Sequence, residues 1–141
     1  MTGLAKLASS AILERDGRFL LVRRANPPSA DMYAFPGGRG EPGESPAETA
    51  LRELVEETGI SGRNPRLFAT YDIKTVRSGS EIESHFFLSV YQVEADITAE
   101  ALAGDDAAAL GWFTPEEIEA LPAPESVHDC VRRLRLREQC E

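Results

Sequence analysis

Three acidic side chains in the middle of the chain are the residues best suited to chemistry: Glu53, Glu56 and Glu57. On a helix these positions fall within an arc of about 100°. Carboxylates this close repel one another, which a helix selected for stability alone would avoid. A divalent cation removes that repulsion, and Mg²⁺ and Mn²⁺ prefer hard oxygen ligands. The alternative interpretation is a solvated acidic face that binds no ligand.

The helix that carries these glutamates is marked at both ends. Ser45 and Glu48 form an N-cap and capping-box pair, and Pro46 occupies the first helical position, where a missing N–H costs nothing. Gly59 supplies a left-handed stop. We therefore expect a helix of about three and a half turns between these signals. Its apolar side should pack into the core and contains Ala47, Ala50, Leu51, Leu54 and Val55.

A glycine-rich stretch precedes this helix and favours a ligand over a plain acidic face. Its glycines, which allow the backbone to approach a ligand closely, are Gly37, Gly38, Gly40 and Gly43. Glu44 stands just before the cap, and Arg52 lies next to Glu53 and one turn before Glu56. This spacing predicts that Arg52 holds a ligand carboxylate in place.

At these positions the sequence resembles the Nudix box. Its pattern is Gly38, five residues, Glu44, seven residues, and then Arg52-Glu53-Leu54-x-Glu56-Glu57-x-Gly59-Ile60, with every defining position filled. The resemblance extends over essentially the whole chain outside the tail. It implies a MutT-like, metal-dependent hydrolase of nucleoside diphosphates linked to another moiety, folded as an α/β/α sandwich around a mixed β-sheet. Water would attack one phosphorus while the other phosphate leaves.

The resemblance also implies a role for each residue of the box. The metal ligands, for Mg²⁺ or Mn²⁺, would be Gly38 through its carbonyl group, Glu44, Glu53, Glu56 and Glu57. Arg52, Glu53 and Glu56 are the expected catalytic residues. The group that accepts the proton of the attacking water stays open between Glu53, Glu56 and an acid of a late loop, and the candidates in that loop are Glu100, Asp105 and Asp106.

The other elements follow the order β, β, short β, α, β, β, β, α, α, which fits a mixed sheet between helices and the α/β class. We expect strands at 7–14, 19–23, 33–35, 66–76, 83–94 and 110–113, with a tight hairpin at 15–18. Two further helices should cover 114–121 and 126–138. The last has an apolar stripe of Val127, Cys130, Val131 and Leu134. Residues 1–141 should form a single domain, with 126–141 as a C-terminal helix and tail.

Residues outside the box could contact the substrate. Arg23 ends a strand that leads into the site, and a planar guanidinium matches phosphate oxygens. The resemblance favours this role, since the family often has an arginine here. Tyr33 and Phe35 share one side of a short strand, so either can stack on a base or ribose. Core packing is the more common fate of such aromatic side chains.

Composition narrows the classes of partner. The formal net charge of -9 argues against a general nucleic-acid or anionic-membrane binder. From the given residues we expect neither a membrane-spanning run nor a secretory signal. Cys130 and Cys140 would lie about 15 Å apart along a helix, so free thiols in the cytoplasm are expected. Four arginines of the last helix suggest docking onto the acidic domain or a second copy, as a homodimer.

The substrate is less well defined by the sequence. The stretches 26–30 and 33–39 resemble those of small bacterial Nudix proteins assigned to ADP-ribose, which makes an ADP-ribose-like compound our first choice. The proline that marks many such enzymes is missing from the stretch Ile73-Lys74-Thr75-Val76. Pyrophosphohydrolysis of (deoxy)nucleoside triphosphates, as in sanitising the nucleotide pool, is the alternative. Two non-enzymatic possibilities are a nucleotide-sensing domain and an interaction module with a structural acidic helix.

Overall fold

The computed structural model describes residues 5–24, 31–76, 82–96, 99–102 and 107–140. Its strands form two small sheets. The first has the order β5-β1-β7-β6, from Gly37–Arg39, Lys6–Ile12, Ile82–Glu94 and Arg63–Val76. The second has the order β2-β3-β4, from Glu14–Arg15, Arg18–Arg24 and Tyr33–Ala34, with β8 (Ala107–Phe113) also paired to β3. Strands β1 and β7 run parallel and the other described pairs are antiparallel, so the mixed α/β class is confirmed.

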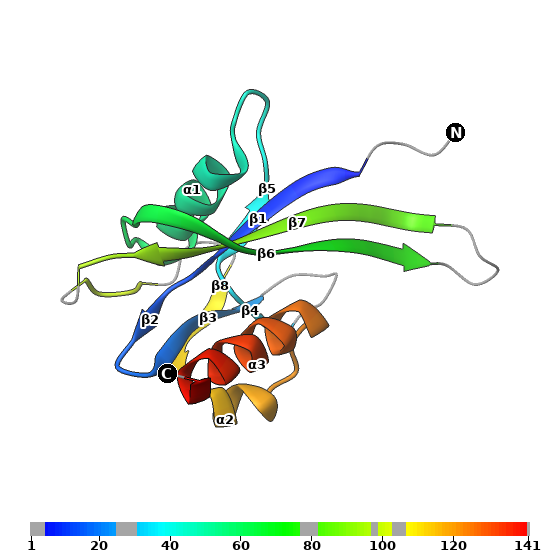
Figure 1. Ribbon diagram of the computed structural model, residues 1–141. Coiled ribbons are helices and arrows are strands. Elements are labelled where there is room, and N and C mark those ends of the chain that lie inside the picture. Colours follow the sequence, from blue (N-terminus) through cyan, green and yellow to red (C-terminus); the bar gives the residue numbers. More distant parts are fainter. Residues whose placement is uncertain (1–4, 25–30, 77–81, 97–98, 103–106, 141) are drawn as a thin grey trace.

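Three helices cover these sheets: α1 (Pro46–Thr58), α2 (Pro115–Glu119) and α3 (Glu125–Cys140). In Figure 1, α1 lies on one side of the first sheet, and α2 and α3 lie on the other. The core follows this division. One buried cluster joins α1 to β1 and β3 through Ala11, Leu20 and Leu54, and another joins α3 to the same strands through Ile12, Leu21 and Val131.

The first expected strand, 7–14, is divided between the two sheets. β1 pairs with β5 and β7, whereas β2 pairs only with β3. Buried Leu13 lies at the break, where its carbonyl oxygen accepts a hydrogen bond from Leu20. The hairpin that follows is as predicted, because Asp16 and Gly17 both have positive φ angles, of 54° and 77°.

Helix α1 has the ends that the sequence predicts. The hydroxyl of Ser45 accepts a hydrogen bond from the Glu48 N–H, the Glu48 side chain accepts one from the Ser45 N–H, and Gly59 is left-handed with φ 76°. The apolar side differs in one residue, since Val55 is 45% exposed. Thr49, Ala50, Leu54 and Thr58 are the buried positions, and Val55 lies about 120° from their mean direction on the helical wheel.

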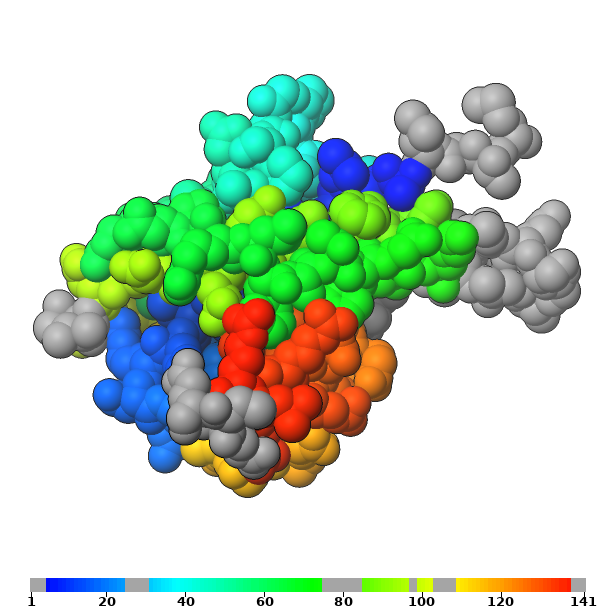
Figure 2. All heavy atoms as spheres, in the orientation of Figure 1, coloured from blue at the N-terminus to red at the C-terminus, as the bar shows by residue number. Residues whose placement is uncertain are grey.

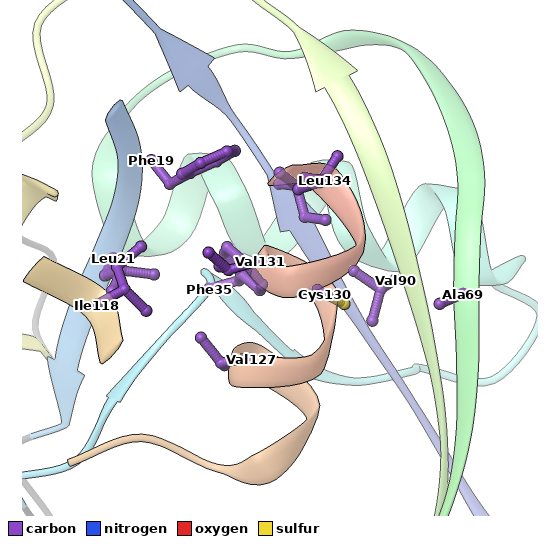
Figure 3. Packing of buried hydrophobic residues seen from close by; sticks show 11 residues of the cluster. Phe19, Leu21, Phe35, Ala69, Val90, Ile118, Val127, Cys130, Val131 and Leu134 are labelled. Carbon is purple, nitrogen blue, oxygen red and sulfur yellow. The ribbon is translucent and has the colours of Figure 1, made fainter. Parts of the chain in front are cut away.

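Helix α3 packs against the first sheet and α2. Its predicted apolar stripe is fully buried, as Figure 3 shows for Val127, Cys130, Val131 and Leu134. Its N-terminal half is also joined to β6, because the Tyr71 hydroxyl donates a hydrogen bond of 2.6 Å to Asp129. Figure 2 shows α3, in orange and red, directly below the green β6.

Three arginines of α3 contact acidic residues of the same chain. Arg132 pairs with Glu119 and Glu125, Arg133 with Asp129, and Arg135 with Glu116. The basic helix therefore docks onto its own domain, which was one of the two expected arrangements. Across the described residues, none of the helices combines the length and hydropathy needed to cross a membrane.

Candidate active site

Strand β5 and helix α1 form the wall of the site. The backbone N–H of Gly37 donates a hydrogen bond of 3.3 Å to Glu57. A Cβ atom at Gly38 would lie 2.6 Å from the carboxyl carbon of Glu53 and 2.7 Å from each of its oxygens. Glycine at position 38 is thus what allows the Glu53 carboxylate to lie directly on the β5 backbone.

One guanidinium group, that of Arg52, organises the remaining carboxylates. Its Nε and Nη2 donate to the two oxygens of Glu44, at 2.7 and 3.1 Å. Its Nη1 donates to Glu53 and to Glu56, each at 2.9 Å, and Nη2 also donates to the Arg39 carbonyl oxygen. These hydrogen bonds, that with Glu44 foremost, raise the pKa of Arg52 further above its usual range. The planar fork fixes three carboxylates relative to one another.

Glu44 has its oxygens engaged by protein donors. Besides Arg52, the Thr49 hydroxyl donates at 2.6 Å and the Glu41 N–H at 3.0 Å. Hydrogen bonding by Arg52, then Thr49, then the Glu41 backbone lowers the pKa of Glu44 to about 2. In this structure Glu44 orients Arg52, and its contact with a metal ion stays a prediction.

A cavity of about 400 Å³ lies beside this wall. Two of its lining residues are carboxylates, Glu53 and Glu57, and two are guanidinium groups, Arg24 and Arg39. The rest of the lining consists of Val22, Ala34, Phe35, Gly37 and Gly38. The cavity therefore combines anionic groups suited to a cation with cationic groups suited to phosphate oxygens.

The side chains of the box fit a divalent cation by their chemistry. Glu53 and Glu57 offer hard oxygens in the cavity, and Glu56, whose side chain is 54% exposed, lies about one turn after Glu53 and directly before Glu57 on α1. Burial, partly offset by Arg52, raises the pKa of Glu53. Across the described residues, no three acidic, imidazole or thiol side chains converge into a preformed metal site. Arg52 instead holds Glu53 and Glu56.

The cationic residues of the cavity differ from the one that the sequence suggested. Arg23 lies at the end of β3 as expected, where it pairs with Asp31 at 3.1 Å. Its neighbour Arg24 lines the cavity instead, together with Val22. Strand alternation alone does not give this result, because the pairing of β3 with β8 shifts register between Arg23 and Arg24 and the sequence does not say which face of β3 meets the site. Arg39, which follows the two glycines of β5, is a second cationic lining residue that the sequence analysis did not name.

A second cavity, of about 220 Å³, adjoins the first and shares five of its lining residues, Arg24 and Phe35 among them. It continues between the first sheet and the start of α3, where its lining is mainly apolar: Ser9, Ser10, Ile73, Leu88, Val90, Pro124, Ser126 and Val127. Phe35 is 5% exposed and lines both cavities. Tyr33 lines neither of them and packs edge-to-face on Phe113, with 5.4 Å between ring centroids.

The late loop is described only in part. Arg15 donates hydrogen bonds to the carbonyl oxygens of Asp96 and Ala99, and the Leu102 N–H donates to Thr58 at the end of α1. Glu100 lies in this anchored part and is exposed. Two of the proposed acids, Asp105 and Asp106, lie outside the described residues. The stretch 26–30 also lies outside them.

Comparisons with known proteins identify a family profile and several similar proteins. The NUDIX domain profile matches residues 5–134. An ADP-ribose pyrophosphatase of Methanocaldococcus jannaschii is 33% identical over 107 residues, which cover 76% of this chain and 60% of that protein. The chain thus spans less than two thirds of the archaeal relative. A CTP pyrophosphohydrolase of Escherichia coli is 34% identical over 114 residues, covering 80% of this chain and 78% of the relative.

The fold leads to the same family. The crystal structure of a MutT NUDIX hydrolase from Burkholderia pseudomallei superposes with a TM-score of 0.81 at 25% identity, and covers 92% of this chain and 98% of that one. Nudix hydrolases are generally dependent on divalent metal ions. The profile match, the relatives and the fold together show that the chain belongs to the Nudix family, and support a hydrolase that acts on pyrophosphate bonds.

Proposed function

We propose that this chain is a metal-dependent pyrophosphohydrolase that cleaves the diphosphate linkage of a nucleoside diphosphate derivative, with an ADP-ribose-like substrate preferred. The observation that carries the proposal is the 400 Å³ cavity, in which Glu53 and Glu57 lie together with Arg24 and Arg39. A pyrophosphate group needs both kinds of side chain, carboxylates to hold its counter-cations and guanidinium groups to bind its oxygens directly.

Each of these residues has a separate task. Glu53, Glu56 and Glu57 would hold Mg²⁺ or Mn²⁺, which when bound neutralises phosphate oxygens and lowers the pKa of water. Arg24 and Arg39 would bind the phosphate oxygens and orient the linkage. Arg52, held by Glu44, would keep Glu53 and Glu56 in position. The proton acceptor remains open between Glu53, Glu56 and an acid of the late loop.

The two adjoining cavities favour a substrate of two parts. The pyrophosphate would lie between the charged residues, and the nucleoside would extend along Phe35 into the apolar 220 Å³ cavity. The relative from M. jannaschii, an ADP-ribose pyrophosphatase, supports the preferred substrate class. The relative from E. coli, a CTP pyrophosphohydrolase of similar identity, supports the alternative, pyrophosphohydrolysis of (deoxy)nucleoside triphosphates.

A substrate panel tests the proposal. ADP-ribose, diadenosine polyphosphates, NADH and the (deoxy)nucleoside triphosphates would be assayed with Mg²⁺ and with Mn²⁺, and products identified by chromatography. We expect the highest kcat/KM for ADP-ribose. A triphosphate with a tenfold higher kcat/KM, or about 1.4 kcal/mol in transition-state binding, would establish the alternative. Binding without turnover of any compound would instead indicate a nucleotide-sensing domain.

A further inference from the structure

A serine hydroxyl group that opens into the apolar cavity has no hydrogen-bond partner in the described part of the chain. Ser10, on β1, is 7% exposed and lines the 220 Å³ cavity. Its hydroxyl neither donates nor accepts a hydrogen bond among the described residues. Around it, Leu88, Val90 and Val127 offer only apolar side chains. The Ser10 hydroxyl is not one of the fully buried side-chain atoms of the described residues, so it opens into the cavity and is available to a polar ligand atom.

The strand next to Ser10 leaves this hydroxyl open to the cavity. Ser10 and Gly37 are directly opposite one another in the antiparallel β1–β5 pair. A Cβ atom at Gly37 would lie 2.7 Å from the Cβ of Ser10 and 2.4 Å from the carbonyl oxygen of Ser9. Only glycine fits there, so no neighbouring side chain on β5 covers the hydroxyl.

Ser10 faces the α3 side of the sheet. It pairs in parallel register with Val90, whose side chain belongs to the buried cluster that contains Val127. Ser9 points to the opposite face, because side chains alternate along a strand, and it also lines a separate cavity beside the start of α1. Of the two serines, Ser10 is therefore the one directed toward the nucleoside end of the proposed substrate.

We propose that the Ser10 hydroxyl forms the hydrogen bond that binds the nucleobase in the apolar cavity. This inference rests on the proposed function, in which the phosphates occupy the charged cavity. The apolar walls accept the faces of a base, while a serine hydroxyl can donate to a ring nitrogen or carbonyl oxygen and accept from an exocyclic amine. Ser10 then contributes to affinity for the nucleoside, and the arginines contribute to affinity for the phosphates.

Calorimetric titration with three probes tests whether Ser10 contributes to affinity for the nucleoside and not to affinity for the phosphates. AMP and CMP carry a base, whereas inorganic pyrophosphate does not. We expect Ser10→Ala to weaken binding of at least one nucleotide about five- to tenfold, the loss of one net hydrogen bond, without changing pyrophosphate affinity. Ser10→Thr retains the hydroxyl and should bind within about threefold of the parent protein. The matched control is Ser89→Ala, since Ser89 is also buried and pairs with Ser9 on the other face of the sheet.

Other outcomes overturn the inference. These are equal effects of Ser10→Ala and Ser89→Ala, an equal loss of pyrophosphate and nucleotide affinity, or no binding of either nucleotide by the parent protein. Thermal melting of each variant separates lost binding from lost folding, and Ser10→Thr provides a second variant if Ser10→Ala unfolds. Hydrolysis is measured separately. If the protein binds nucleotides through Ser10 but turns over no substrate, the proposed hydrolase activity is refuted and the role of Ser10 stands. If it turns over substrate but Ser10→Ala leaves nucleotide affinity unchanged, only the role of Ser10 is refuted.

Discussion

At the scale of single residues, the position of Arg52 decides how the carboxylates of the box are arranged. Exposed ion pairs contribute little to stability, but the Arg52 side chain is only 23% exposed and its two-pronged contact with Glu44 has bidentate geometry. Lysine would keep the charge and lose the fork, because an ammonium group cannot hold two carboxylates in fixed directions. The arrangement of Glu53 and Glu56 therefore depends on the shape of this side chain as much as on its charge.

We predict that Arg52→Lys and Arg52→Ala lower kcat at least tenfold with only a modest change in KM, because Arg52 positions ligands and does not line the cavity. Steady-state kinetics on the best substrate of the panel measure this. The matched control is Arg132→Lys, an arginine that also pairs with two glutamates, but on α3. A loss confined to KM would make Arg52 a substrate contact instead.

The second residue-scale prediction concerns Glu57. Glu57→Gln removes a charged oxygen ligand but keeps an oxygen that can accept the hydrogen bond from Gly37. Turnover should fall at least a hundredfold, while the melting temperature stays within a few degrees because the residue has no apolar packing role. Glu116→Gln, on the exposed surface of α2, is the control. Activity within about threefold of the parent, under one kcal/mol of barrier, would rule out the metal-ligand role.

At the scale of elements, the sequence predicts helix ends and tight turns reliably, because short local motifs determine them. The capping box at Ser45, the left-handed Gly59 and the hairpin at Asp16-Gly17 are all confirmed, because each depends on residues within a few positions. The division of the strand 7–14 between two sheets was not predicted, since it is decided by which strands pair over long distances.

The same limit explains what was missed around the site. Choosing Arg24 over Arg23 requires knowing which face of β3 meets α1, and the exposure of Val55 depends on the angle at which α1 packs. Both depend on tertiary contacts. The spacing of the box, by contrast, indicated the contacts of Arg52 with Glu53 and Glu56 directly, because they occur within one helix.

The element-scale prediction concerns the attachment of α3. Tyr71→Phe removes the hydroxyl that donates to Asp129 and contacts Cys130, and should destabilise the fold by about 1–3 kcal/mol. Burial, then the hydrogen bond to Asp129, raises the pKa of Tyr71, so its contribution is full below the unfolded pKa of about 10 and lost as pH rises above it. Denaturant melts at pH 8 and pH 11 measure both effects.

The control for this prediction is Tyr91→Phe, a partly buried tyrosine of β7 that packs against the α1 side of the core. Because α3 also forms part of the apolar cavity, Tyr71→Phe should raise the Kd for nucleotides more than that for pyrophosphate. Equal stability losses in the two variants would show that the Asp129 hydrogen bond does not hold α3 in place.

At the scale of the whole molecule, charge sets the conditions for binding. The chain carries 24 acidic residues against 15 lysines and arginines. A polyanionic substrate is repelled by such a molecule unless local cations lie in its path. Arg24 and Arg39 supply two of them in the cavity, and the remaining positive charge must come from bound metal ions. We therefore expect metal ions to stabilise the folded protein even without substrate.

The last prediction concerns this stabilisation of the folded protein by metal ions. A ligand that binds only the folded state stabilises it by about 2.7 kcal/mol at 100 times its Kd. For a chain of 141 residues this corresponds to a rise in melting temperature of roughly 9 °C. Mn²⁺ or Mg²⁺ should therefore raise the melting temperature, and KCl at equal ionic strength should not reproduce the rise, because screening acts on all charges alike. The double variant Glu53→Gln, Glu57→Gln should lose most of it, since it removes two charged ligands and lessens the repulsion on α1. The same rise in the double variant and the parent would place the bound ions elsewhere on this acidic surface.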